Sequence, residues 1–212
     1  MNRRLRRRAA ALALAAVSVA GAPVARADSA APPPARVFLR LAVGPAFMVE
    51  SWSPSTPDPG AVSTGWAPAL EVTVGKRVRP RWVLAGTLQV AGVIDRSESF
   101  EGGSYTLPDT IHFLDTIGAL VDRDLGGRYG GHLGAALGLM TVSELDTSFG
   151  SFATSWGFAA SVHGGIEPVV RGRWRMGVAG RLTLYRYGSD DPPPSATSWG
   201  LLSSLLLTFT RQ

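Results

Sequence analysis

The sequence predicts an all-β protein, namely an eight-stranded antiparallel up-and-down β-barrel that crosses a membrane. Three observations support this fold class. Eight segments alternate apolar residues with small or polar ones, Trp residues stand at the ends of these segments, and the connections between them are alternately short and long. Tight turns at one end and long loops at the other are typical of transmembrane barrels.

The first 27 residues have the pattern of a cleaved export signal. Arginines crowd residues 3–8, residues 9–22 are apolar, and Ala25 and Ala27 place small residues where a signal peptidase reads them, so cleavage is expected before Asp28. An uncleaved membrane helix is the alternative, but such a span needs about 20 strongly apolar residues. Residues 28–35 are proline-rich and are expected to be an extended lead-in, which leaves residues 36–212 for the barrel.

Removal of the signal changes the charge balance. The whole chain has 21 Lys and Arg against 16 Asp and Glu, but residues 1–27 hold six arginines and no acid, so the remainder has 15 against 16. The basic composition therefore does not indicate a nucleic-acid partner. The chain contains no Cys, which excludes a lipoprotein attachment site and a disulfide framework.

The first predicted strand, about residues 36–50, shows the alternation clearly. Val37, Leu39 and Leu41 would face one side, and Arg40 and Ala42 the other. A strand in lipid must present an apolar side chain at every second position. Further strands with this pattern are predicted around residues 66–75, 82–94, 129–139, 156–167, 174–185 and 199–210.

The fourth strand, about residues 111–123, fits less well. If Ile111, Ile117 and Val121 face lipid, then Asp115 does so too. A β-bulge at Asp115, or a position near the membrane interface, would relieve the cost of placing this carboxylate in hydrocarbon.

The second face of the strands decides between two kinds of barrel. A lipocalin-like soluble barrel that binds a small apolar ligand would line its interior with apolar residues. Here the second face carries charged and polar side chains among Gly and Ala, which predicts a narrow lumen filled by a polar network. Its members are Arg40, Glu71, Gln89, His132, His163, Glu167, Arg175 and Arg181.

Aromatic residues mark two levels along the predicted strands. Trp66, Trp156 and Trp199 stand at the long-loop ends, and Trp82, Trp174 and Tyr129 at the short-turn ends. Because indole and phenol rings favour the headgroup zone, these residues predict two aromatic girdles.

Together, residues 36–212 resemble the small bacterial outer-membrane barrels of the OmpA, OmpX and opacity-protein kind. The resemblance implies an outer-membrane location among phospholipid and lipopolysaccharide, with both chain ends in the periplasm. It also implies that the barrel-assembly machinery recognises the last strand, residues 199–211, through Phe209. Such strands usually end on the aromatic residue, whereas three residues follow Phe209 here.

A hairpin register can be proposed around residues 171–173. Pairing Val170 with Trp174 places His163 opposite Arg181 and puts Glu167 diagonal to Arg175, all toward the lumen. These groups are expected to fill the lumen with ion pairs; a gate or a binding site is the alternative.

Catalysis has little support in the sequence. Acyl-chain hydrolases on such barrels carry a His-x-Ser pair that faces lipid, but Ser161 and His163 stand in the reverse order and face inward. His112 and His132 have no nearby serine at that spacing, and the histidine spacing predicts no metal-ligand cluster and no cofactor. We therefore predict a non-enzymatic protein, with a lipid-modifying enzyme as an alternative.

The predicted long loops, about residues 50–65, 95–110, 143–155 and 187–198, are acidic. Divalent cations could bridge these acids to lipopolysaccharide or to a surface ligand, or the acids could form a solvated surface. They are Glu50, Asp58, Asp95, Glu98, Glu101, Asp109, Glu144, Asp146, Asp190 and Asp191. The expected role is structural or one of surface interaction.

Overall fold

The computed structural model describes residues 37–53, 61–100, 102–146, 151–188 and 197–212. The strands are β1 (Phe38–Ser53), β2 (Ala61–Arg79), β3 (Trp82–Phe100), β4 (Gly103–Gly126), β5 (Gly131–Asp146), β6 (Ser151–Ile166), β7 (Val169–Arg171), β8 (Trp174–Gly188) and β9 (Thr197–Arg211). The predicted export signal and the lead-in lie outside the described residues.

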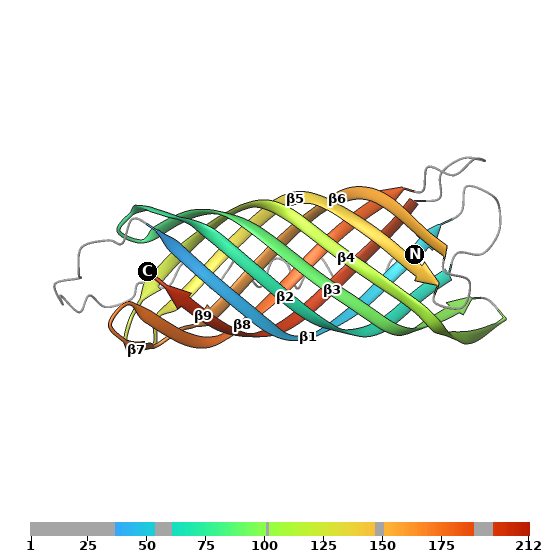
Figure 1. Ribbon diagram of the computed structural model, residues 1–212, viewed down its shortest axis with the longest axis horizontal. Coiled ribbons are helices and arrows are strands. Elements are labelled where there is room, and N and C mark those ends of the chain that lie inside the picture. Colours follow the sequence, from blue (N-terminus) through green and yellow to red (C-terminus); the bar gives the residue numbers. More distant parts are fainter. Residues whose placement is uncertain (1–36, 54–60, 101, 147–150, 189–196) are drawn as a thin grey trace. The chain divides into compact units, whose positions relative to one another are not determined.

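The sheet closes on itself to form a barrel (Figure 1). The strand order is β6-β5-β4-β3-β2-β1-β9-β8-β7, and β6 also pairs with β8. All neighbouring strands are antiparallel. The three-residue β7 follows β6 in the sequence and pairs with β8, as β6 does. The predicted eight-stranded antiparallel barrel is confirmed. No apolar helix long enough to span a membrane occurs among the described residues.

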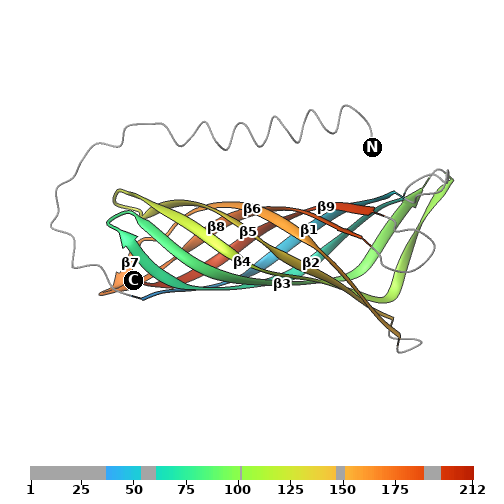
Figure 2. The same ribbon diagram turned by 90° about the horizontal axis from the view of Figure 1, so that it is seen from above.

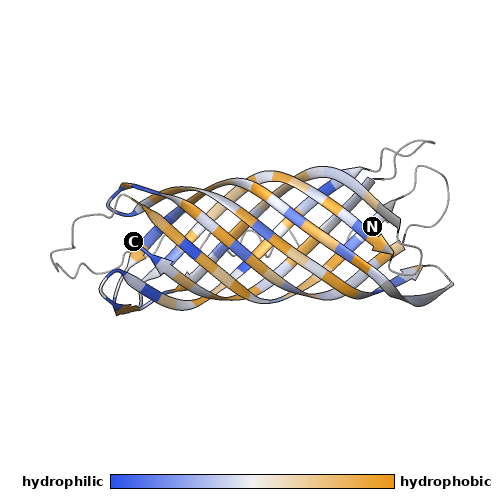
Figure 3. Ribbon diagram, in the orientation of Figure 1, coloured by the Kyte–Doolittle hydropathy of each residue, from blue (hydrophilic) through white to orange (hydrophobic). Residues whose placement is uncertain are grey.

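The barrel wall is apolar outside, as the alternation predicts. Figure 3 shows hydrophobic and hydrophilic residues alternating along the strands. Along β8, every second side chain from Trp174 to Leu184 is exposed, while Ala179, Arg181 and Thr183 are buried in the interior. Transmembrane barrels need this inverted arrangement because hydrocarbon surrounds them. The predicted girdle residues Trp66, Trp82, Tyr129, Trp156, Trp174 and Trp199 are all exposed.

One end of the barrel, the short-turn end, carries the tight connections. Only Pro80 and Arg81 join β2 to β3, and only Gly172 and Arg173 join β7 to β8. Gly172 has φ +56°, a left-handed backbone conformation that Gly adopts without steric cost. The described barrel also starts and finishes here, since the backbone N–H of Gln212 donates to the carbonyl of Arg173 at 3.1 Å.

The opposite end, the long-loop end, differs from the prediction. The segments predicted as loops 95–110 and 143–155 are mostly strand, because β3 reaches Phe100, β4 begins at Gly103, and β5 and β6 continue to Asp146 and from Ser151. Thr and aromatic residues favour strands, and the Phe100 and Tyr105 rings pack with centroids 5.8 Å apart. Figure 2 shows the two hairpins diverging at this end. Loop residues 54–60 and 189–196 lie outside the described residues.

Asp115 keeps a regular position in β4. It is paired with Val90 on one side and Thr141 on the other, so the β-bulge, one of the two alternatives that the sequence leaves open, does not occur at this residue. The irregularity between β3 and β4 lies instead between Ile94 and Arg96. The Asp115 side chain is half-buried on the outer face, in one row of cross-strand neighbours with Thr141 and the girdle residue Trp156.

The interior is less uniformly polar than the sequence predicts. A large apolar cluster includes Met48, Leu114, Met140 and Leu202, and a smaller one gathers Phe38, Val83 and Leu120 with two alanines. These residues share the inward face with the charged side chains. The inside of the barrel therefore alternates charged and apolar patches.

Adding a methyl group at Gly200 should destabilise the barrel. A Cβ there would overlap the ring of Tyr185, which is 2% exposed and whose hydroxyl donates to Glu50. We expect Gly200→Ala to cost about 1–3 kcal/mol, the range for overpacking. Urea unfolding in detergent micelles measures it.

Gly180→Ala is the matched control, because a Cβ at this outward position meets nothing within 4 Å. An equal loss of stability in the two variants would contradict the packing explanation.

Candidate functional site

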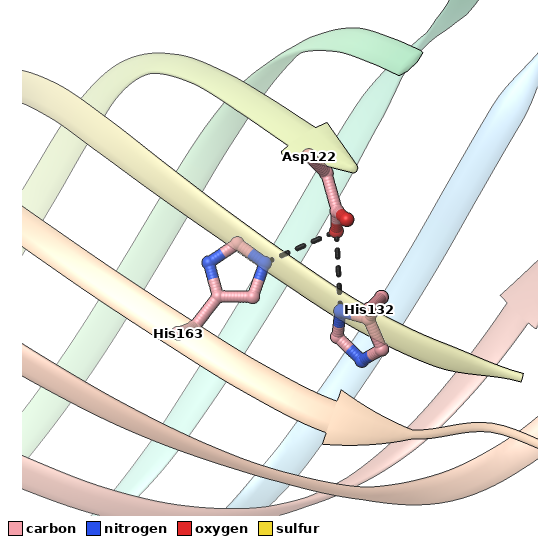
Figure 4. Close-up of side chains that lie close together, drawn as sticks. All are labelled: Asp122, His132 and His163. Atoms are coloured by element: carbon pink, nitrogen blue, oxygen red, sulfur yellow. Dashed lines mark hydrogen bonds and ion pairs between the residues drawn. The ribbon is translucent and has the colours of Figure 1, made fainter. Parts of the chain in front are cut away.

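A cluster of charged side chains fills the lumen near the short-turn end. It consists of Arg40 on β1, Asp122 on β4, His132 on β5, His163 on β6 and Glu167 just after β6, and we call it the Asp122 cluster. All five are at most 6% exposed. The four strands β1, β4, β5 and β6 therefore contribute to one site, together with the residue that follows β6. Figure 4 shows the Asp122 carboxylate between the two imidazoles.

Asp122 is the centre of this cluster. Its Oδ2 accepts a hydrogen bond from Nη1 of Arg40 at 2.7 Å, and lies 3.1 Å from Nε2 of His163 and 3.3 Å from Nδ1 of His132. The Nε of Arg40 is 3.1 Å from Oε1 of Glu167. One guanidinium therefore bridges two buried carboxylates, which is the arrangement that buried charges require.

Two glycines make room for the imidazoles. A Cβ at Gly134 would overlap the ring of His163, and a Cβ at Gly165 would lie 2.8 Å from Nε2 of His132. The glycines on β5 and β6 are therefore part of the site, because any larger residue would displace a histidine.

The donor atoms of the Asp122 cluster are of a type that binds metals. The histidine spacing in the sequence predicts no such cluster, but the fold brings one atom each of Asp122, His132 and His163 within 4.8 Å of one another. Zn²⁺ takes imidazole nitrogen and carboxylate oxygen. However, the guanidinium of Arg40 contacts all three: Nη1 is 3.3 Å from Nε2 of His163, and Nη2 is 3.3 Å from Nδ1 of His132. The cation at this point is Arg40.

A second ion pair lies beside the Asp122 cluster. Arg181 donates to Glu71 and, at 2.7 Å, to Oγ of Ser161, while Thr73 donates to Glu71 at 2.9 Å. Arg181 is the cross-strand neighbour of His163, which is the register proposed from the sequence. Gln89 accepts a hydrogen bond from Thr183 at 3.3 Å.

Arg175 pairs with a carboxylate that the predicted network does not include. The sequence places it diagonal to Glu167, but its Nη1 is 3.6 Å from Asp124, which also pairs with Arg77. β6 ends before Glu167, and Pro168 has no N–H to continue the ladder. The turn register also shifts there, so Arg171, in place of Val170, pairs with Trp174.

A further cluster, which the alternation does not predict, lies near the long-loop end. We call it the Glu50 cluster: Glu50, Arg96, His112, Tyr185 and Tyr187. Glu50 accepts hydrogen bonds from Tyr185 at 3.0 Å and Tyr187 at 2.6 Å, and its Oε2 is 3.6 Å from Nε2 of His112. Arg96 lies 3.0 Å from Nδ1 of His112.

A β-bulge in β3 explains why the alternation does not predict the Glu50 cluster. Strict alternation from the outward Ile94 would place Arg96 outside, but the irregularity between them turns Arg96 inward. Arg96 then pairs with Glu98 at 2.6 Å and with Glu144 at 2.8 Å. Glu50, Glu98 and Glu144, predicted on loops, therefore lie on strands and have cationic or phenolic partners. The other predicted loop acids have side chains outside the described part.

Small and apolar residues separate the two clusters. Between Arg40 and Glu50, the inward positions of β1 are Ala42, Gly44, Ala46 and Met48. Between Asp122 and His112, the inward positions of β4 include Leu114 and Leu120, each at most 2% exposed. No ion pair joins the clusters within the part of the chain that the structure describes. Among the described residues, the Asp122 cluster and the Glu50 cluster are therefore two separate groups of ion pairs.

No protein-family model and no curated protein sequence matches the chain. Solved structures do match it. Neisserial surface protein A (NspA) has a TM-score of 0.51 at 16% identity, covering 82% of this chain and 98% of that one. The outer membrane protein AlkL in lipid bilayers has a TM-score of 0.55 at 10% identity, covering 90% and 97%.

The chain has the fold of the small outer-membrane barrels. The likeness covers nearly the whole described barrel. The low identity reflects that a barrel wall needs alternating side chains more than specific ones.

Replacing Arg40 should convert the Asp122 cluster into a metal site. Arg40→Met leaves two buried carboxylates without their cation, which we expect to cost about 3–5 kcal/mol. The three donor atoms then converge on an open point, so Zn²⁺ should raise the Tm of the variant and leave that of the wild type unchanged. Thermal unfolding in micelles, with and without Zn²⁺, measures both effects.

The double variant Arg40→Met/His163→Asn provides the control, since it removes one of the three donors. A Zn²⁺ response as large as that of Arg40→Met alone would mean that the metal binds elsewhere.

Proposed function

We propose that this chain is an outer-membrane barrel whose lumen is closed by its own buried side chains and whose long-loop end interacts with the surroundings. The observation that carries the proposal is the filled interior: the Asp122 cluster, the Glu71–Arg181 pair and the apolar residues along β1 occupy the lumen in turn. A general pore would need a water-filled path through this region.

The exposed apolar side chains of the outer wall, which we call the apolar belt, support residence in a membrane. Leu137 and Phe158 are 71% and 72% exposed on the outside, while Arg40, Glu71 and Arg181 are buried within. A soluble lipocalin-like barrel would expose the charged residues and bury the apolar ones. This reading includes the export signal, residues 1–27, and recognition of residues 199–211 by the barrel-assembly machinery, with Phe209 on the outer face.

A structural role is favoured over catalysis. Ser161 and His163, the only pair considered for acyl chemistry, are both buried inside, and Ser161 already accepts a hydrogen bond from Arg181. Lipid on the outer wall cannot reach them. We infer a non-enzymatic protein.

The hairpins at the long-loop end supply the candidate surface for interaction. Trp52, Phe100 and Tyr105 are between 42% and 46% exposed there, near the strand ends. Glu98 accepts a hydrogen bond from the hydroxyl of Tyr105, its cross-strand partner in the β3–β4 hairpin. A hairpin with exposed aromatic side chains suits contact with another surface molecule.

The closed lumen predicts a low conductance. In planar bilayers, the wild-type barrel should show no steady large-pore current. The double variant Glu71→Ala/Arg181→Ala removes an ion pair without leaving an unpaired charge, so we expect a higher conductance from it. Steady porin-like current through the wild type would overturn the closed lumen.

The proposed orientation places the short-turn end and both chain ends in the periplasm. Because the chain has no Cys, single cysteines report position without background. A membrane-impermeant maleimide added to intact cells should label Ser104→Cys on the β3–β4 hairpin and spare Arg173→Cys in the β7–β8 turn. Both should react after lysis, and the opposite pattern would reverse the orientation.

A further inference from the structure

Exposed cationic side chains surround the short-turn end of the barrel. We call them the basic collar: Lys76, Arg79, Arg81, Arg123, Arg128, Arg171, Arg173 and Arg211, all exposed. Hydrophilic residues gather at this end, beside the C label of Figure 3.

The acids at the same end do not neutralise the collar. Asp122 and Glu167 are buried with Arg40, and Asp124 pairs with the half-buried Arg77 and Arg175. Among the described residues, no member of the collar has an ion-pair partner. The collar therefore presents eight exposed positive charges that form no ion pair with any carboxylate of the described residues.

Three arginines of the collar lie against aromatic residues of the girdle at the short-turn end. The Cζ of Arg123 is 5.5 Å from the ring centroid of Trp82, that of Arg211 is 5.8 Å from Trp174, and that of Arg128 is 5.9 Å from Tyr129. Trp82 with Arg123, and Trp174 with Arg211, are cross-strand pairs on the outer face. Each guanidinium is thus held on the side of the barrel that meets the membrane.

The depth of these guanidinium groups follows from their partners. Val121 precedes Arg123, and Phe209 precedes Arg211, on the same outward faces, and both are part of the apolar belt. Arg123 and Arg211 therefore lie at the edge of the apolar belt. Trp and Tyr favour this headgroup level, where the phosphates of phospholipids lie.

We propose that the basic collar binds the phosphate groups of anionic phospholipids in the membrane leaflet at the short-turn end. Guanidinium groups bind phosphate in a bidentate manner, and stacking on a girdle ring orients them before the lipid arrives. The proposal rests on the barrel spanning a membrane, as in the proposed function, and is independent of which side faces the cell surface.

The long-loop end offers a matched comparison. Arg186 stacks on Trp199 at 5.0 Å, so the same cation–π contact exists there. However, the sequence segments at that end are acidic, with ten carboxylates against Arg96 and Arg186. A lone arginine among acids should not collect anionic lipid, whereas eight exposed cations should.

The test uses phospholipid selectivity in vesicles. The full barrel is reconstituted in phosphatidylcholine containing brominated phosphatidylglycerol or brominated phosphatidylcholine, and quenching of the Trp residues gives the relative affinity for the two lipids. We expect a preference for phosphatidylglycerol that weakens at high salt. The variant Arg123→Gln/Arg128→Gln/Arg211→Gln should lose about fivefold in that preference for each charge removed.

Two further variants test whether the preference depends on the charge of the arginines and on their position at the short-turn end. Arg123→Lys/Arg128→Lys/Arg211→Lys should keep most of the preference, because the charge remains. Arg186→Gln should leave it unchanged. Heat-modifiable mobility on gels checks that every variant is folded.

The proposal is overturned if wild type and the Gln variant show the same preference, if phosphatidylcholine binds as well as phosphatidylglycerol, or if inorganic phosphate displaces the lipid at equal phosphate concentration. Failure of the wild type to insert into vesicles would instead overturn the membrane barrel itself.

Discussion

Closure of the sheet through the ladder between β1 and β9 is the constraint on which the rest of the structure depends. Backbone N–H and C=O groups in hydrocarbon have no water to bind, so an open edge would leave a row of them unpaired. The register from Leu39 with Arg211 to Ser53 with Thr197 pairs the two outermost strands of the sequence. Once the ladder closes, the diameter of the barrel is fixed, and so is the space that side chains inside it can fill.

That limited space accounts for the composition of the interior. The imidazoles of His163 and His132 fit because Gly134 and Gly165 lie beside them. The charges in turn need partners, because Arg40, Asp122, Glu71 and Arg181 are buried. Charged and apolar patches therefore fill the barrel in alternation, and each closes the gaps that the other leaves.

Much of this arrangement can be predicted from the sequence, because a two-residue period places each side chain on one face. Arg40, Glu71, His163 and Arg181 were assigned to the lumen in this way, and the pairing of His163 with Arg181 follows from one turn. The period predicts a face but not which strands meet across the lumen. Asp122 was missed as the centre of its cluster for that reason, since its partners lie on β1, β5 and β6.

Other differences come from local irregularities. The bulge between Ile94 and Arg96 turns Arg96 inward, and the alternation does not predict it. The residues up to Ile94 alternate regularly, and the two faces are exchanged only after the bulge. The segments around residues 95–110 and 143–155 are rich in Ser, Gly and Asp, which indicates loops, yet hairpin pairing extends the strands through them. The pattern also does not predict that Arg175 pairs with Asp124, because Asp124 lies at the end of β4 and not on the neighbouring strand.

The asymmetry of charge between the two ends also bears on how the barrel enters its membrane. In the proposed orientation, the hairpin tips that must traverse the bilayer carry carboxylates, and the exposed arginines remain on the side of entry. At the bilayer midplane Arg and Lys cost about 2–4 kcal/mol each, and Asp and Glu cost less. The cations that would slow translocation most are therefore those that never translocate. In the proposed orientation, the collar would therefore favour one direction of insertion, independently of any ligand of the loops.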